Sequence, residues 1–141
     1  MILAKLELQL RTSKSEDLPL PRNPTIEHVM PQSWEEHWPL RDGRTVPSVL
    51  QRFLQDIKEP EADRRDTLIH TIGNLTLLTG SLNPAIGKLG YQTKRAEVLK
   101  HSELALNRYF YGVESWDEAS IEARAKWLFE HAVQVWPYPA D

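Results

Sequence analysis

The stretch Thr25-Ile26-Glu27-His28-Val29-Met30-Pro31 places a carboxylate and an imidazole side by side between apolar residues. These residues are β-prone and a proline ends the run, so we expect a short strand over 25–30. A second β-prone stretch, Gly73-Asn74-Leu75-Thr76-Leu77-Leu78, comes later in the chain and leads to Asn83. Together the two stretches predict a pair of antiparallel strands, over 25–30 and 74–79, followed by a helix. We expect the rest of the chain to form the scaffold around them.

The composition fits one compact domain. The chain has 141 residues, of which 40% are hydrophobic and five are tryptophan, enough for a single core. It has no cysteine, which excludes disulfides, thiol catalysis and cysteine-based zinc sites. No apolar run approaches the length of a membrane span. The N-terminus carries charges at its fifth and seventh residues, so we expect no signal peptide and a cytoplasmic location.

Charge is unevenly distributed along the chain. The net charge of −3 argues mildly against a nucleic-acid partner, because nucleic acid prefers basic surfaces. Residues 86–110, however, carry five basic and two acidic side chains, whereas residues 111–141 carry two basic and six acidic ones. The basic segment can present one positive face, although for any single charge a solvated helix surface is the plainer interpretation.

Helices are expected on both sides of the two stretches. Residues 2–10 fit either a strand or a helix, and their helix-forming composition favours the helix. Residues 12–24 contain three prolines and form a connector, so we divide the chain into an N-terminal helix and Pro-rich connector (1–24) and a domain (25–141). Two further helices are expected before the second stretch: 45–57, capped by Thr45, and 61–72, ended by Gly73. Three are expected after it. The first starts at the N-cap Ser81 and has Asn83 in its first turn, the second covers 92–110 with a break near Ser102, and the third covers 115–136 with a capping box at Ser115–Glu118.

The apolar residues of these helices predict which faces are buried. In the helix at 45–57 they recur at helical spacing and define one inward stripe: Val46, Val49, Leu50, Phe53, Leu54 and Ile57. We expect the tryptophans in the core and Arg124 as a buried partner of carboxylates. The predicted fold class is α+β and mainly helical, with a small ββα hairpin-helix unit (25–31 and 73–90) embedded in a helical domain.

The paired Glu27 and His28 suggest hydrolytic chemistry. A histidine accepts a proton from water near neutral pH, which makes His28 a candidate general base. Hydrolysis of a phosphodiester also needs charge stabilisation, which a divalent metal supplies. Mg²⁺ prefers oxygen ligands and takes few from the protein, and Glu27 and Asn83 offer such oxygens. Neighbours on a strand point to opposite faces, so Glu27 and His28 can flank a metal only at a strand end.

Each of these side chains also has a plainer interpretation. A histidine beside a glutamate is commonly a surface ion pair, and Glu27 can serve only to orient His28 or a water. Asn83 can form an ordinary hydrogen bond at a helix start, and Asn74 fits a structural role better than a chemical one. None of the other histidines has metal-like spacing, although His70 lies close to the second stretch in sequence.

The stretches Ile26–Gln32, Gly73–Leu78 and Ser81–Pro84 resemble the HNH (ββα-metal) nuclease motif. More narrowly, they are similar to the C-terminal nuclease domain of GmrSD-type, modification-dependent (type IV) restriction enzymes. The Glu-His-x-x-Pro piece alone is weak, but its combination with Gly-Asn-Leu-Thr-Leu-Leu and an asparagine nine residues after Asn74 is fairly specific. Further matches lie in Lys94-Arg95, in Ser102–Arg108 and in the closing helix with Trp116, Ile121, Arg124 and Trp136.

This resemblance implies a role for each matching residue. His28 would be the general base, and Glu27 a metal ligand where many HNH nucleases have aspartate. Asn83 would be the third-position ligand. Asn74 would brace the loop that carries the histidine, through hydrogen bonds. Lys94-Arg95 would hold substrate phosphates or the local fold.

The resemblance also implies a function. It predicts a DNA endonuclease that uses Mg²⁺ or Mn²⁺ in restriction of foreign, modified DNA, together with an N-terminal NTPase and DNA-sensing domain or subunit. These 141 residues contain no glycine-rich phosphate loop of the kind that an NTPase needs. The alternative is a catalytically silent HNH-like module that binds DNA or a partner. RNA is a weaker third possibility, because nothing in the sequence recognises the sugar.

Overall fold

Two short strands and seven α-helices form the part of the chain that the computed structural model describes, residues 2–11, 19–20, 22–80 and 82–139. The α-helices are α1 (Ile2–Leu10), α2 (Val49–Leu54), α3 (Pro60–Leu68), α4 (Pro84–Gly87), α5 (Tyr91–His101), α6 (Ala105–Arg108) and α7 (Glu118–Val135). The strands are β1 (Thr25–His28) and β2 (Leu75–Leu78), and three short 3-10 turns are η1 (Trp34–Glu36), η2 (Ile72–Asn74) and η3 (Tyr109–Gly112). The expected mainly helical α+β class is confirmed.

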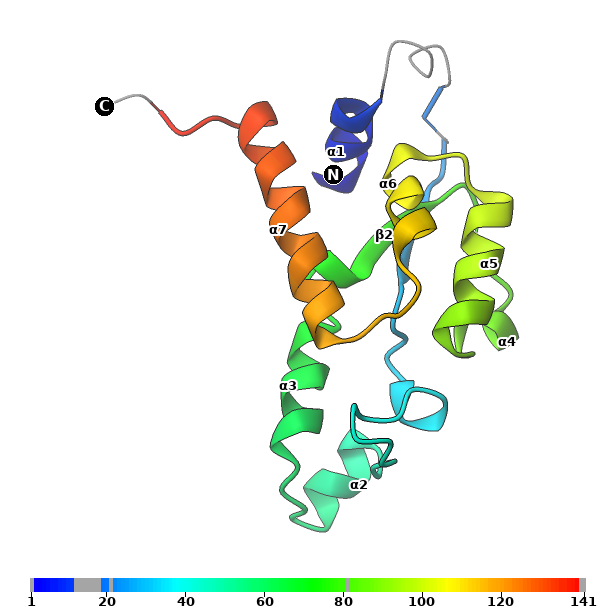
Figure 1. Cartoon of the computed structure of the whole chain (residues 1–141), viewed down its shortest axis with the longest axis vertical. Coiled ribbons are helices and arrows are strands. Elements are labelled where there is room, and N and C mark those ends of the chain that lie inside the picture. Colours follow the sequence, from blue (N-terminus) through cyan, green and yellow to red (C-terminus); the bar gives the residue numbers. More distant parts are fainter. Residues whose placement is uncertain (1, 12–18, 21, 81, 140–141) are drawn as a thin grey trace.

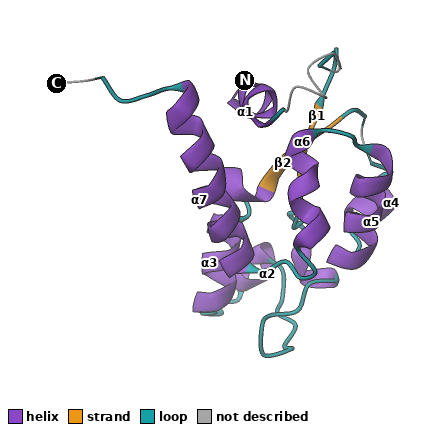
Figure 2. Cartoon of the chain, turned by 45° about the horizontal axis from the view of Figure 1, so that its top comes forward, coloured by secondary structure: helices purple, strands orange, loops and turns teal. Residues whose placement is uncertain are grey.

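The two strands pair antiparallel in the middle of the molecule. Glu27 lies opposite Thr76, and His28 lies opposite Leu75. Beyond the end of β1, the amide of Val29 still donates to the carbonyl of Asn74 at 2.8 Å. Figures 1 and 2 show this hairpin between α7 on one side and α5 on the other. The strands expected at 25–30 and 74–79 are therefore confirmed, with slightly shorter bounds.

Two groups of buried side chains hold the helices to the hairpin. The larger contains five buried aromatic side chains: Trp34, Trp38, Tyr91, Phe110 and Trp116. The smaller is aliphatic and joins α1 to β2, α6 and α7 through Leu3, Leu6, Leu77, Leu104, Leu106 and Leu128. Residues 2–10 are thus a helix whose leucines pack on the domain. Three of the five tryptophans are buried as expected, whereas Trp136 is 48% exposed.

The close approach of α7 to the hairpin depends on Gly73. A Cβ at this position would lie 2.1 Å from the carbonyl oxygen of Ile121 on α7, so no larger residue fits. We expected Gly73 to end the preceding helix. Instead α3 ends at Leu68, and Gly73 lies inside η2, where its missing side chain makes room for α7.

Three helix starts differ from those expected, although the helices themselves are present. The cap of α2 is Ser48 in a capping box with Gln51, and Thr45 lies upstream of it. The cap of α7 is Asp117, which accepts from the amide of Ser120. Asn83 is itself the N-cap of α4 and does not lie in its first turn. Ser81, the expected cap, lies outside the described residues. The break expected near Ser102 separates α5 from α6.

The apolar stripe expected to be buried at 45–57 is on the surface. Val46 is buried, but the four apolar side chains of α2 are between 58% and 81% exposed: Val49, Leu50, Phe53 and Leu54. The side chain that anchors α2 is Arg52, which is 3% exposed. It donates to the carbonyl of Pro47 at 2.7 Å and pairs with Asp66. An ionic anchor therefore replaces the expected hydrophobic one.

Among the described residues, none of the helices has the length and hydrophobicity that crossing a membrane requires.

The contrast between two phenylalanines tests this placement of α2. Phe110 is 2% exposed and Phe53 is 81% exposed. We expect Phe110→Ala to lower the free energy of unfolding by about 3–5 kcal/mol, because it leaves a cavity in the core. Phe53→Ala should change it by less than about 0.5 kcal/mol. Urea denaturation of both variants measures the difference, and equal losses would contradict an exposed stripe.

Candidate functional site

The end of β1 holds Glu27 and His28 on opposite faces of the hairpin. Successive side chains of a strand alternate in direction, and their contacts here differ accordingly. Glu27 faces α5, where its Oε1 atom lies 2.7 Å from the Nζ atom of Lys94. The half-buried ring of His28 lies edge-on to the ring of His70, with 5.7 Å between ring centroids. The two neighbours therefore have separate surroundings.

The buried side chain of Asn74 fixes the backbone that follows His28. Its Oδ1 accepts from the amide of Met30 at 2.8 Å, and its Nδ2 donates to the carbonyl of Met30 at 2.9 Å. Nδ2 also donates to the carbonyl of Ile69 at 2.9 Å. The indole of Trp116 donates to Oδ1 at 3.0 Å. Both polar atoms of the amide are thus used within the protein, which is the geometry of a brace. A part in catalysis stays a prediction.

Lys94 lies inside the protein. The residue is 1% exposed, and its ammonium donates to the carbonyls of His28 and of Gly87, the latter at 3.0 Å. With Glu27 as the third partner, all three N–H groups of the ammonium have oxygen acceptors. Burial lowers the pKa of Lys94, and the hydrogen bond and charge of Glu27 oppose that shift.

Arg95 also forms hydrogen bonds with the protein backbone. Its guanidinium donates to the carbonyls of Phe110 at 2.7 Å and Tyr111 at 2.6 Å. Of the two roles that the resemblance implies for Lys94-Arg95, this geometry favours support of the local fold over contact with substrate phosphates.

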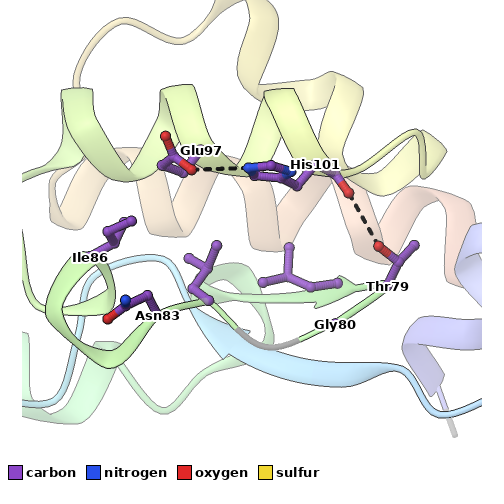
Figure 3. Close-up of a pocket in the computed structure, with 8 residues that line it drawn as sticks. Thr79, Gly80, Asn83, Ile86, Glu97 and His101 are labelled. Atoms are coloured by element: carbon purple, nitrogen blue, oxygen red, sulfur yellow. Dashed lines mark hydrogen bonds and ion pairs between the residues drawn. The ribbon is translucent and has the colours of Figure 1, made fainter.

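Asn83 lies at the start of α4, beside an open groove of about 470 Å³ between α5 and the segment that joins β2 to α4 (Figure 3). Its Oδ1 accepts from the amide of Ala85 at 2.9 Å, and the side chain is exposed. Figure 3 shows Glu97 and His101 on α5, across the groove from Asn83 and Thr79. The Nε2 atom of His101 lies 3.2 Å from the Oε2 atom of Glu97. Asn83 is therefore accessible to a ligand that enters the groove.

The surroundings of His28 favour its neutral form. Burial is the largest cause of a lowered pKa for this imidazole, followed by the nearby His70. The carboxylate of Glu27 raises the pKa, and the ammonium of Lys94 lowers it further. The net effect is a lowered pKa, which favours the neutral imidazole that a general base requires.

Several contacts of the site were not foreseen from the sequence. The bond from Trp116 to Asn74 joins residues 42 positions apart. Arg124 is buried, but its partners are the carbonyls of Gly73 and Leu75 and the hydroxyl of Thr76, not carboxylates. The position of His70, next to the second motif in sequence, was the one available sign of its contact with His28.

Two side chains of the site carry oxygens of the kind that a hard cation accepts. A carboxylate at Glu27 and an exposed amide at Asn83 are ligand types that Mg²⁺ accepts. No three His, Asp or Glu side chains come together as a metal cluster among the described residues. One oxygen of Glu27 is engaged by Lys94. These two residues could supply at most a few ligands, which suits a cation that retains several waters.

Most of the chain matches a known protein family. Residues 1–131 match the family described as GmrSD restriction endonucleases, C-terminal domain. Because the match covers most of the chain, the protein belongs to this family, and the resemblance noted from its motifs is confirmed. No match was found among curated proteins or among solved structures.

Two asparagines allow a matched test of the brace. Asn74→Ala leaves the amide of Met30, the indole of Trp116 and two carbonyls without partners. We expect it to lower the free energy of unfolding by about 2–5 kcal/mol. Asn83→Ala removes only an exposed cap and should cost about 1 kcal/mol. Chemical denaturation of the two variants checks the order, and a milder loss at Asn74 would contradict the brace.

The titration of His28 is a second test. We expect NMR to give a pKa below the usual value of about 6.5. Glu27→Gln should lower this pKa further, and His70→Gln should raise it. Since the folded pKa lies below the unfolded one, the contribution of His28 to stability is complete above about pH 6.5 and is lost as the pH falls below it. Comparing wild type with His28→Gln at two pH values checks the sign. A folded pKa above 6.5 would refute it.

Proposed function

We propose that this chain is a metal-dependent DNA endonuclease of the HNH type in which His28 activates water to hydrolyse a phosphodiester bond. The observation that carries the proposal is the brace from Asn74 to Met30, because it brings the two sequence motifs together directly behind His28. The half-buried imidazole, whose pKa is lowered, is in the right form to accept a proton. Membership of a restriction endonuclease family supports the same reaction class.

In this proposal the oxygens of Glu27 and Asn83 would hold a Mg²⁺ or Mn²⁺ ion. The bound ion would stabilise the charge that builds on the phosphate and the leaving oxygen. The chain's own residues do the rest: His28 takes the proton from water, and Asn74 holds the backbone behind it. The groove beside Asn83 would let a DNA strand approach that residue.

The proposal extends to the biological setting, and the family membership supports it. The DNA cut would be foreign and modified, and an NTPase and DNA-sensing domain or subunit would select it. A cytoplasmic location belongs to the same prediction.

A silent HNH-like module that binds DNA or a partner is the second candidate function. The exposed apolar side chains of α2 favour it, because a partner protein would cover such a surface. This candidate predicts salt-dependent DNA binding without cleavage under any metal.

Cleavage by a histidine variant separates the two candidates. We expect wild type to cut duplex DNA with Mg²⁺ or Mn²⁺, and His28→Ala to be slower by about 10²–10⁴-fold, because the general base is missing. His37→Ala removes an exposed imidazole and serves as the matched control, with wild-type activity. Circular dichroism should show that both variants keep the fold. Equal cleavage by wild type and His28→Ala across several metals would reject the proposal.

A further inference from the structure

The ammonium of Lys94 connects three separate parts of the candidate site. It contacts Glu27 and the carbonyl of His28, both at the end of β1. It also contacts the carbonyl of Gly87, the last residue of α4, whose N-cap is Asn83. Lys94 itself lies on α5. One side chain therefore links the strand with the candidate base to the helix with a candidate ligand.

We propose that Lys94 is a positioning residue, which holds the end of β1 against α4 through its three oxygen partners and does not contact DNA. This inference rests on the proposed function. Its burial is the decisive observation, because a residue that is 1% exposed presents no charge to a phosphate. All three of its donors are already used by the protein, so no donor is left for a substrate oxygen.

The location of these partners explains why a charged group is needed there. The carbonyl of His28 points away from β2, because residues of an antiparallel pair alternate between inward and outward hydrogen bonding. No further strand among the described residues pairs with that edge. An unpaired buried carbonyl is costly, and the ammonium satisfies it together with the carbonyl of Gly87. Glu27 supplies the counter-charge that lets the ammonium stay buried.

A salt-dependence experiment distinguishes positioning from DNA contact. DNA affinity is measured at several salt concentrations in a His28→Ala background, so that the DNA stays intact. In this background we expect the Lys94→Met variant to have the same slope of log affinity against log salt concentration as the protein that keeps Lys94. A residue that neutralises one phosphate would lower the slope by about 0.9. A slope reduced by that amount would overturn the proposal.

Hydrogen exchange tests the link itself and needs no activity. In Lys94→Met, we expect the amides of residues 28–30 and 85–88 to exchange faster together, although the two segments are far apart in sequence. Lys100→Met, which removes an exposed lysine from the same helix, is the matched control and should leave both segments unchanged. Unchanged exchange in Lys94→Met would overturn the proposal. If that variant does not fold, Lys94→Gln, which keeps a polar group in the cavity, is tested by the same criteria.

Single-turnover cleavage, with enzyme in excess over DNA and with saturating metal, connects the link to the reaction. For Lys94→Met we expect the rate constant to fall by about 10–100-fold, as is typical when a group that orients the site is removed, with little change in the enzyme concentration that gives half the maximal rate. A wild-type rate in Lys94→Met would refute positioning while leaving the proposed function intact. If wild type itself does not cut DNA, the proposed function fails, and the exchange and salt experiments still decide whether Lys94 holds the two segments together.

Discussion

The side chain of Asn74 is the contact on which the arrangement of the site depends. Its amide offers one acceptor and one donor group, and the backbone of Met30 uses both. This pair of bonds extends the hairpin by one position past the end of β1, because the amide of Asn74 bonds to Met30 as the backbone of a paired strand would. Aspartate could not donate, and glutamine would be one methylene too long. The segment after His28 is therefore held by a group that no other residue type reproduces.

Side chains also close the outer edges of the hairpin. A two-stranded sheet is marginal alone, because each strand has an unpaired edge. Here Arg124 donates to the carbonyl of Leu75 at 2.6 Å, and Asn107 donates to the carbonyl of Leu77 at 2.7 Å, which covers β2. Lys94 covers β1 at His28. Helices α5, α6 and α7 thus each supply one buried polar side chain in place of a neighbouring strand.

The sequence predicted the parts of the fold that local chemistry determines. The strands around Glu27 and Asn74 follow from β-prone residues bounded by a proline and a glycine, and α7 follows from its long apolar repeat. The prediction that the apolar stripe on α2 is buried was wrong. Helical periodicity shows that one face of a helix is apolar, but it does not show that another element covers that face. Nothing local shows that Arg52 would find Asp66 and anchor the helix by charge.

The candidate site shows the same division. Glu27, His28 and Asn83 were singled out from their motifs, and the structure places them around one hairpin. The sequence left open whether Lys94 holds substrate phosphates or the local fold, because a lysine near a suspected phosphate site has the same sequence whether it faces solvent or the core. Its partners are mostly backbone carbonyls, which every residue carries and no motif records. The partners of Arg124 could not be predicted for the same reason, because two of them are backbone carbonyls.

The pleat of β1 separates the two neighbours at the centre of the site. Glu27 belongs to the layer formed by α4 and α5, through Lys94, whereas His28 belongs to the opposite face, near His70. Their relative position is therefore set mainly by the backbone at the strand end. That backbone is held on one side by Asn74 and on the other by Lys94. A shift of either support would move the imidazole relative to the carboxylate, even though neither support touches the imidazole.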